Sequence, residues 1–142
     1  MSLETNKAII RRYNEMWQTG EVQIADEIMS PGYIDHSHPE WPAGVEGVKA
    51  SVRAFHQAFS EIEGQTEQMI SEGEWVAFRF TLQARHTGAM GPFPATGKHV
   101  VYRGTDFIRL EGGKMVELWS AADTLDWVKQ LGGVLHLPKT PR

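Results

Sequence analysis

The chain has 142 residues, a formal net charge of −4 and no cysteine, and a chain of this length is expected to form one domain. Its 14 basic residues form no run or stripe, and no apolar run reaches about 18–20 residues, so neither nucleic acid nor a membrane is expected as a partner. The lack of cysteine excludes disulfides and thiolate chemistry, and the N-terminal stretch lacks the basic-then-apolar order of a signal peptide, so we expect a cytoplasmic protein.

The first half of the chain is predicted to be mainly helical. Apolar residues recur at steps of three and four before Gly20, which would end the first helix as a C-terminal cap. A second, short helix is expected to stop at Ser30-Pro31-Gly32, and Pro39 and Pro42 predict a loop. The predicted elements, in order, are helices over residues 4–19 and about 22–29, an extended arm over 33–38, a loop over 39–44 and a helix over 44–62.

The second half changes to a period of two, which is typical of strands. Two alternating runs meet at Gly112-Gly113, which predicts a β-hairpin. The predicted elements are strands over residues 65–71 and 75–87, a loop over 88–97, hairpin strands over 100–110 and 114–123 joined by a turn over 111–113, a helix over 125–131 and a mobile tail over 138–142. Helices followed by antiparallel strands predict an α+β fold, in which a curved sheet wraps around the N-terminal helices and encloses a cavity at its open end.

Several short motifs occur in a distinctive order and spacing along nearly the whole chain. They include Tyr33-Ile34-Asp35-His36, Arg85-His86-Thr87-Gly88, Gly113-Lys114-Met115-Val116-Glu117-Leu118-Trp119 and Gln130-Leu131-Gly132. On these motifs the chain resembles the SnoaL-like polyketide cyclases, a branch of the nuclear transport factor 2-like superfamily. The resemblance implies a single domain over residues 1–142, a cone-shaped fold, a small hydrophobic or polyketide-like ligand, and no metal or organic cofactor. A homodimer or homotetramer is also expected.

The resemblance places one catalytic role on Asp123, because in the family an aspartate of the last strand is the general acid/base of an intramolecular aldol ring closure. If the hairpin loop has two or four residues, Asp123 lies opposite Tyr102 and Trp119 lies opposite Asp106, so that all four line one pocket wall. A three-residue loop with a bulge would shift this pairing by one. A carboxylate against aromatic faces loses hydration, which raises its pKa toward neutral pH. The alternative is that Asp123 only caps the terminal helix.

Asp106 and His86 are the other catalytic candidates. Aspartate is a poor strand former, so Asp106 in mid-strand predicts either a pocket role or a buried pair with an arginine such as Arg79 or Arg103. His86 ends an apolar strand face, where it could polarise a substrate carbonyl or, alternatively, bond to a loop carbonyl.

The N-terminal third supplies candidate substrate contacts. Tyr13 and Trp17 lie one helical turn apart and could border the pocket or belong to the core. His36 and His38 share one side of an extended arm. We expect His36 at the pocket rim and His38 in water, since Pro39 bends the chain. Two histidines are too few for a metal site unless the fold adds a third ligand, so no metal is expected.

The sequence therefore predicts a cofactor-independent acid/base enzyme of the SnoaL-like cyclase type. Its catalytic candidates are Asp123, His86 and Asp106, and its candidate substrate contacts are Tyr13, Trp17, His36, Tyr102 and Trp119. A non-catalytic binder of small hydrophobic ligands, or an isomerase or epoxide hydrolase on the same fold, remains open. A hydrolase would need Asp106 and Asp123 to bracket Arg103, which strict strand alternation opposes.

Overall fold

The structure is a computed structural model that describes residues 2–139. Residues 140–142 of the expected tail lie outside the described residues. The elements in order are α1 (Leu3–Thr19), α2 (Ile24–Ile28), β1 (Met29–Asp35), α3 (Gly44–Ala58), β2 (Phe59–Glu72), β3 (Trp75–His86), β4 (His99–Glu111), β5 (Lys114–Ala122) and α4 (Thr124–Gln130). None of the described helices is both long and apolar enough to cross a bilayer.

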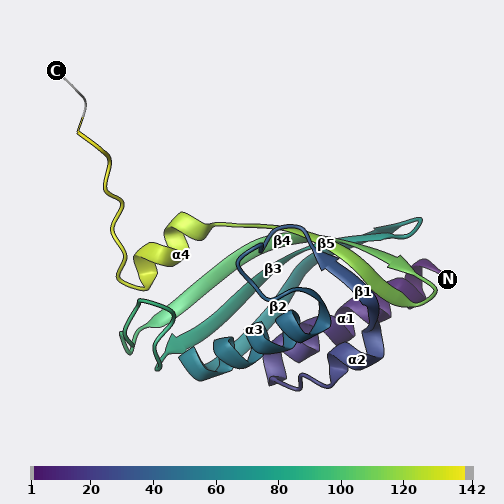
Figure 1. Cartoon of the computed structure of the whole chain (residues 1–142), viewed down its shortest axis with the longest axis horizontal. Helices are drawn as coiled ribbons and strands as arrows, with labels where there is room; N and C mark the ends of the chain where they lie inside the picture. Colours follow the sequence, from purple (N-terminus) through teal and green to yellow (C-terminus); the bar gives the residue numbers. More distant parts are fainter. Residues whose placement is uncertain (1, 140–142) are drawn as a thin grey trace.

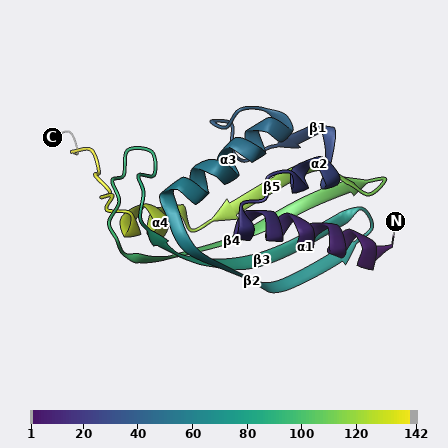
Figure 2. The same cartoon turned by 90° about the horizontal axis from the view of Figure 1, so that it is seen from below.

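One five-stranded curved sheet carries the fold, with the strand order β1-β5-β4-β3-β2. Neighbouring strands are antiparallel except β1 and β5, which run parallel. Helices α1, α2 and α3 lie on one face of this sheet (Figures 1 and 2). The predicted α+β architecture, a curved sheet around N-terminal helices, is therefore confirmed.

Helix α4 closes one end of the sheet. Its Gln130 side chain accepts the Val101 backbone N–H and donates to the Val101 carbonyl, both at 2.7 Å. These two bonds dock α4 against β4 although the helix follows β5 in the chain. As a result Trp127, which is buried, lies against Tyr102 with ring centroids 4.9 Å apart.

The largest boundary differences from the sequence prediction lie in β1 and where α3 meets β2, which begins at Phe59 rather than at residue 65. The expected break at Ser30-Pro31-Gly32 lies inside β1, where the pairing with β5 is irregular between Met29 and Ile34. Because β1 is an edge strand, it tolerates a proline that cannot donate to a ladder. The third helix ends at Ala58 rather than residue 62, because Phe59 already pairs with His86 in the sheet. Phe59, whose spacing fits the apolar stripe of the helix, is therefore buried as the first residue of β2.

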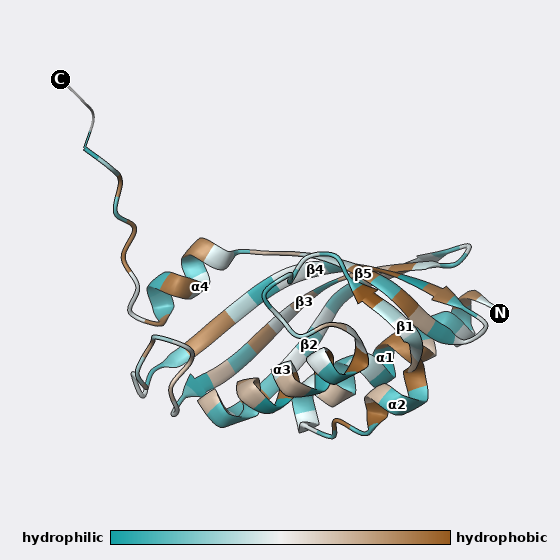
Figure 3. Cartoon of the chain, in the orientation of Figure 1, coloured by the Kyte–Doolittle hydropathy of each residue, from teal (hydrophilic) through white to brown (hydrophobic). Residues whose placement is uncertain are grey.

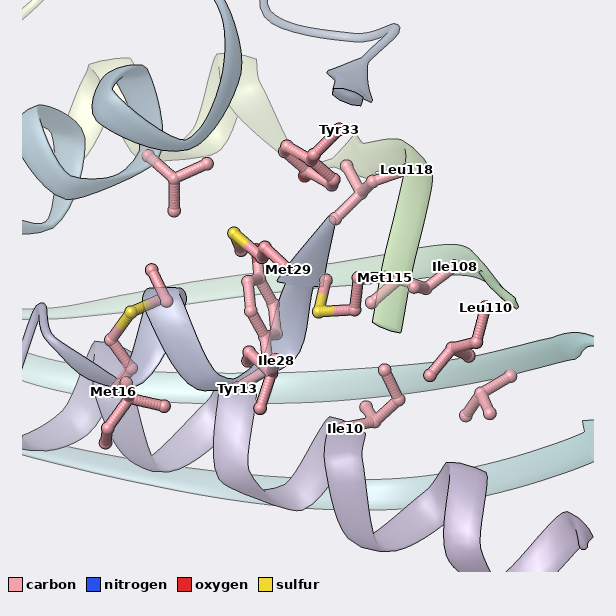
Figure 4. Close-up of a cluster of buried hydrophobic side chains, with 14 of the residues drawn as sticks. Ile10, Tyr13, Met16, Ile28, Met29, Tyr33, Ile108, Leu110, Met115 and Leu118 are labelled. Carbon is pink, nitrogen blue, oxygen red and sulfur yellow. The ribbon is translucent and has the colours of Figure 1, made fainter. Parts of the chain in front are cut away.

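Two apolar clusters fill the space between the helices and the sheet. The first joins α1 to β1, β4 and β5, and Figure 4 shows Tyr13, Ile28, Met29 and Met115 within it. The second contains Phe55, Ala58, Phe59, Ala84, Val100, Trp127 and Leu131 and lies toward α4. Hydrophobic and hydrophilic segments alternate along the strands (Figure 3), as expected for a sheet with one covered face.

Candidate active site

A cavity of about 780 Å³ opens between the helices and the concave face of the sheet, where the two apolar clusters meet. This volume is within the range of sites that hold drug-sized ligands, about 300–1,000 Å³. Its apolar walls include Trp17, Trp41, Phe55, Phe78, Phe80, Leu82, Met90, Leu118 and Trp127. Its polar groups include Tyr13, Asn14, Gln18, Ser37, His38, Glu40, Ser51, Gln65, Thr66, Tyr102, Asp106, Ser120 and Thr124.

The register of the β4–β5 hairpin decides which side chains reach this cavity. The loop has two residues, since Glu111 pairs with Lys114, but Arg109 then pairs with Glu117 and Leu110 with Met115. Val116 is therefore an extra residue on β5, and it shifts the pairing by one. Asp106 lies opposite Ser120 rather than opposite Trp119. The predicted common wall of Tyr102, Asp106, Trp119 and Asp123 is thus wrong, because the bulge rotates the end of β5.

Asp123 does not line the cavity. It caps α4, with its Oδ1 accepting the backbone N–H of Asp126 at 3.4 Å, and its side chain is exposed. It borders a separate groove on the outer face of the sheet, together with Arg79 and Arg103. Asp123 therefore forms the expected helix cap, whereas its catalytic role stays a prediction that this position does not favour.

Among the described residues, two carboxylic acids line the cavity: Glu40, which is exposed, and Asp106, which is buried in the wall. Asp106 is 6% exposed, and its Oδ1 is buried without a hydrogen-bond partner. Burial raises the pKa of Asp106 from 3.8 to about 6, and the charge of Asp35 acts in the same direction. The Ser120 hydroxyl and the charge of His38 act in the opposite direction and do not cancel this shift. Asp106 can therefore exchange a proton near neutral pH.

The alternative of a buried ion pair between Asp106 and an arginine is wrong. Arg79 and Arg103 are exposed on the outer face of the sheet, where Arg79 donates to Gln68 at 3.3 Å. Strand alternation explains this, because Arg103 is an odd number of residues from Asp106. The described residues that line the cavity include no arginine, so the arrangement expected for an epoxide hydrolase is absent from this wall.

The expected positions of His36 and His38 are reversed. His38 lines the cavity, where its ring stacks on Trp41 with centroids 3.9 Å apart. His36 lies outside the cavity, stacked on Trp119 at 4.2 Å, and its Nε2 is 2.9 Å from Glu117 Oε2. Neither His36 nor Trp119 lines this cavity, so their predicted contact with substrate stays a prediction that these positions do not favour. The cause is local, since Asp35 holds His38 through Nδ1 at 2.7 Å and turns the loop inward.

Three other predicted substrate contacts do line the cavity: Tyr13, Trp17 and Tyr102. Tyr13 and Trp17 meet edge to face with ring centroids 6.5 Å apart. Burial, with the nearby Asp106, raises the pKa of Tyr102 to about 12. Burial also raises the pKa of Tyr13 well above 10. Both phenols are therefore neutral hydrogen-bond donors at physiological pH.

His86 lies in the protein core and does not line the cavity. It is completely buried in the second apolar cluster, stacked on Phe59 at 5.2 Å. Its Nδ1 lies 3.0 Å from the Thr96 hydroxyl and accepts the Thr96 backbone N–H at 3.3 Å, while Nε2 has no partner. The histidine does bond to the loop, as the alternative expected, but to the hydroxyl and backbone N–H of Thr96 rather than to a loop carbonyl. His86 is not among the residues that line the cavity.

His86→Ala is expected to lower the free energy of unfolding by about 3 kcal/mol, because it removes a buried ring and the bond that ties the 88–97 loop to β3. Urea titration followed by circular dichroism measures this loss. Without urea, where the variant is folded, the pH dependence of its turnover should match that of the wild type. A displaced pH profile would show that the histidine takes part in the chemistry.

Sequence reasoning missed His38, Trp41, Ser37 and Ser120 as cavity residues. A signal was present for the first of these, because an aspartate three residues before a histidine can hold the turn between them. Asp35 Oδ1 indeed accepts the Ser37 backbone N–H at 2.8 Å. Ser120 carried no such signal, since its orientation depends on the bulge at Val116.

The fold and the cavity together define an α+β cone protein with a mostly apolar small-molecule site and a buried acid in its wall. The family model described as SnoaL-like polyketide cyclase matches residues 7–131, and the chain belongs to this family.

Curated relatives agree with this assignment. The chain is 33% identical over 131 residues to aklanonic acid methyl ester cyclase DauD of Streptomyces sp. (strain C5), covering 87% of this chain and 80% of DauD. It is 32% identical over 137 residues to aklanonic acid methyl ester cyclase DnrD of Streptomyces peucetius, covering 92% of both chains. The structure of TsrD from Streptomyces laurentii superimposes with a TM-score of 0.87 at 21% identity, over 94% of this chain and 99% of TsrD. This last likeness concerns the fold alone.

Proposed function

We propose that the protein is a cofactor-independent enzyme that closes a ring in a polyketide-type carbonyl compound by an intramolecular aldol reaction. The observation that carries the proposal is Asp106, a carboxyl group in the wall of a large apolar cavity, with a pKa raised to about 6. A general base is most effective when its pKa lies near the working pH. Asp106 meets this condition, whereas an exposed aspartate does not.

The proposed chemistry begins when ionised Asp106 removes a proton from a carbon next to a carbonyl group. The resulting enolate attacks a second carbonyl of the same molecule, and the ring closes. The apolar walls favour a folded, multi-ring substrate, because Trp17, Trp41 and Trp127 present large aromatic surfaces to the cavity. The neutral phenols of Tyr13 and Tyr102 supply hydrogen bonds to substrate oxygens.

The curated relatives supply the first substrate to test, because both are named for a cyclase acting on aklanonic acid methyl ester. We expect the purified protein to convert this ester to a cyclised isomer of unchanged mass, resolved by chromatography and confirmed by mass spectrometry. The alternative is a non-catalytic binder. In that case the ester would bind in the cavity without reacting, and other polyketide carbonyl compounds would not react either. The expected homodimer or homotetramer stays a prediction, which sedimentation velocity can test on the same material.

A further inference from the structure

The loop after β1 carries a second proton-handling group to the cavity. Asp35 holds this loop from behind, with Oδ2 2.7 Å from His38 Nδ1 and Oδ1 accepting the Ser37 N–H at 2.8 Å. Trp41 stacks on the His38 ring with the two planes within 7° of parallel. The imidazole is therefore fixed both along its edge and across its face, as a positioned catalytic group would require.

The same loop is fastened beside Asp106. The Ser37 hydroxyl oxygen accepts the backbone N–H of Ser120 at 2.7 Å, and Ser120 is the residue that pairs with Asp106 across β4 and β5. His38 and Asp106 both line the cavity. The buried carboxyl group of Asp106 and the imidazole of His38 thus line the same cavity, and the Ser37–Ser120 bond ties the elements that carry them.

The tautomer and charge of His38 follow from its neighbours. Because Nδ1 faces the Asp35 carboxylate, Nδ1 carries a proton, and Nε2 is the nitrogen left to meet a ligand. Burial lowers the pKa of His38, but the hydrogen bond to Asp35 and the charges of Asp35, Glu40 and Asp106 outweigh it and raise the pKa above 6.5. His38 therefore keeps its Nε2 proton in the pH range where Asp106 has lost its own.

We propose that His38 is the general acid of the ring closure and that Asp35 is its positioning residue. This inference rests on the proposed aldol function and assigns the electrophilic side of that reaction. His38 donates its Nε2 proton to the oxygen of the carbonyl under attack, while Asp106 acts on the carbon that attacks.

The step balances without a further reactant. The proton of the C–H bond goes to Asp106, and its electron pair forms the new C–C bond. The π electrons of the attacked carbonyl move to its oxygen, which takes the proton from His38 Nε2 and becomes a hydroxyl group. The enzyme is left with neutral Asp106 and neutral His38, and proton exchange through water restores ionised Asp106 and protonated His38.

The test compares the pH dependence of kcat in the wild type, His38→Gln, Asp35→Asn and Asp106→Asn. A rate that needs ionised Asp106 and protonated His38 rises and then falls with increasing pH. We expect His38→Gln to lower kcat by about 100-fold or more and to abolish the falling limb. Asp35→Asn should move that limb to lower pH, because it removes the partner that keeps His38 protonated. His99→Gln, at an exposed position outside the cavity, is the matched control and should leave the profile unchanged.

A second measurement does not depend on turnover. NMR titration of the His38 ring in the full chain should give a lower pKa in Asp35→Asn than in the wild type, and circular dichroism checks that each variant is folded. If Asp106→Asn abolishes turnover while His38→Gln keeps both rate and falling limb, the inference fails and the proposed function stands. If the wild type turns over no polyketide carbonyl substrate, the proposed function and the inference fail together.

Discussion

Asp106→Asn is expected to lower kcat for ring closure by about 10²- to 10⁴-fold, the usual contribution of a general acid or base. Asparagine has nearly the same shape as aspartate but cannot accept a proton from carbon. The Michaelis constant should change little, because Asp106 is one group among mostly apolar walls. Steady-state assays of the cyclised product at saturating substrate measure the effect.

This result depends on an intact cavity, so substrate binding by the variant must be measured as well. Binding with near-normal affinity and greatly reduced turnover would place the loss in the chemical step. Turnover within about threefold of the wild type would remove Asp106 from the mechanism.

The same substitution is expected to stabilise the protein at neutral pH. Asp106 has its folded-state pKa raised from 3.8 to about 6, so the folded protein holds a proton that the unfolded chain releases. The stability of the wild type therefore falls as pH rises from about 4 to 6, and it stays lower above that range. The two pKa values correspond to a total penalty of about 3 kcal/mol, which Asp106→Asn removes.

Urea unfolding of both proteins at about pH 4.5 and 7.5 tests this prediction. Relative to the wild type, the variant should gain about 2 kcal/mol between these two pH values, because part of the penalty is already present at the lower one. Glu67→Gln, which replaces an exposed carboxyl of β2, is the matched control and should show no such gain. An equal difference at both pH values would mean that Asp106 titrates as an exposed carboxyl does.

Such a gain would also explain why a buried carboxyl stands in mid-strand. Asp106 lowers stability at neutral pH and contributes no ion pair to the core. Groups that cost stability where they stand are characteristic of functional sites. The unfolding experiment and the kcat measurement therefore test two consequences of the burial of the Asp106 carboxyl group.

The regular elements of this fold follow from local sequence patterns. The alternation from Trp75 onward predicted β3 to within one residue, because one face of the strand packs on the core and the other faces water. The same reasoning placed Phe59 in the third helix, which was wrong. An apolar residue four positions after Phe55 fits either a helical stripe or the start of a strand. Only the pairing of Phe59 with His86, which are distant in the sequence, decides between them.

The site was less predictable because it depends on one inserted residue. The sequence leaves the loop length open between two, three and four residues. The hairpin has a two-residue loop between Glu111 and Lys114, and a single bulge at Val116 then exchanges the two faces of β5. Trp119 thereby turns outward and Ser120 inward. Nothing in the local pattern separates Asp106 from Asp123, since desolvation depends on the whole cavity and not on neighbouring residues.

The central claim is that the reacting carboxyl group is Asp106, inside the cavity, rather than Asp123, which caps α4 on the outside. The most direct measurement is kcat for Asp106→Asn and Asp123→Asn on the same substrate at the same pH. Asparagine also caps helices well, so Asp123→Asn should retain wild-type turnover within about threefold, while Asp106→Asn should lose at least about 100-fold. The reverse pattern, with Asp123→Asn inactive and Asp106→Asn active, would contradict the account.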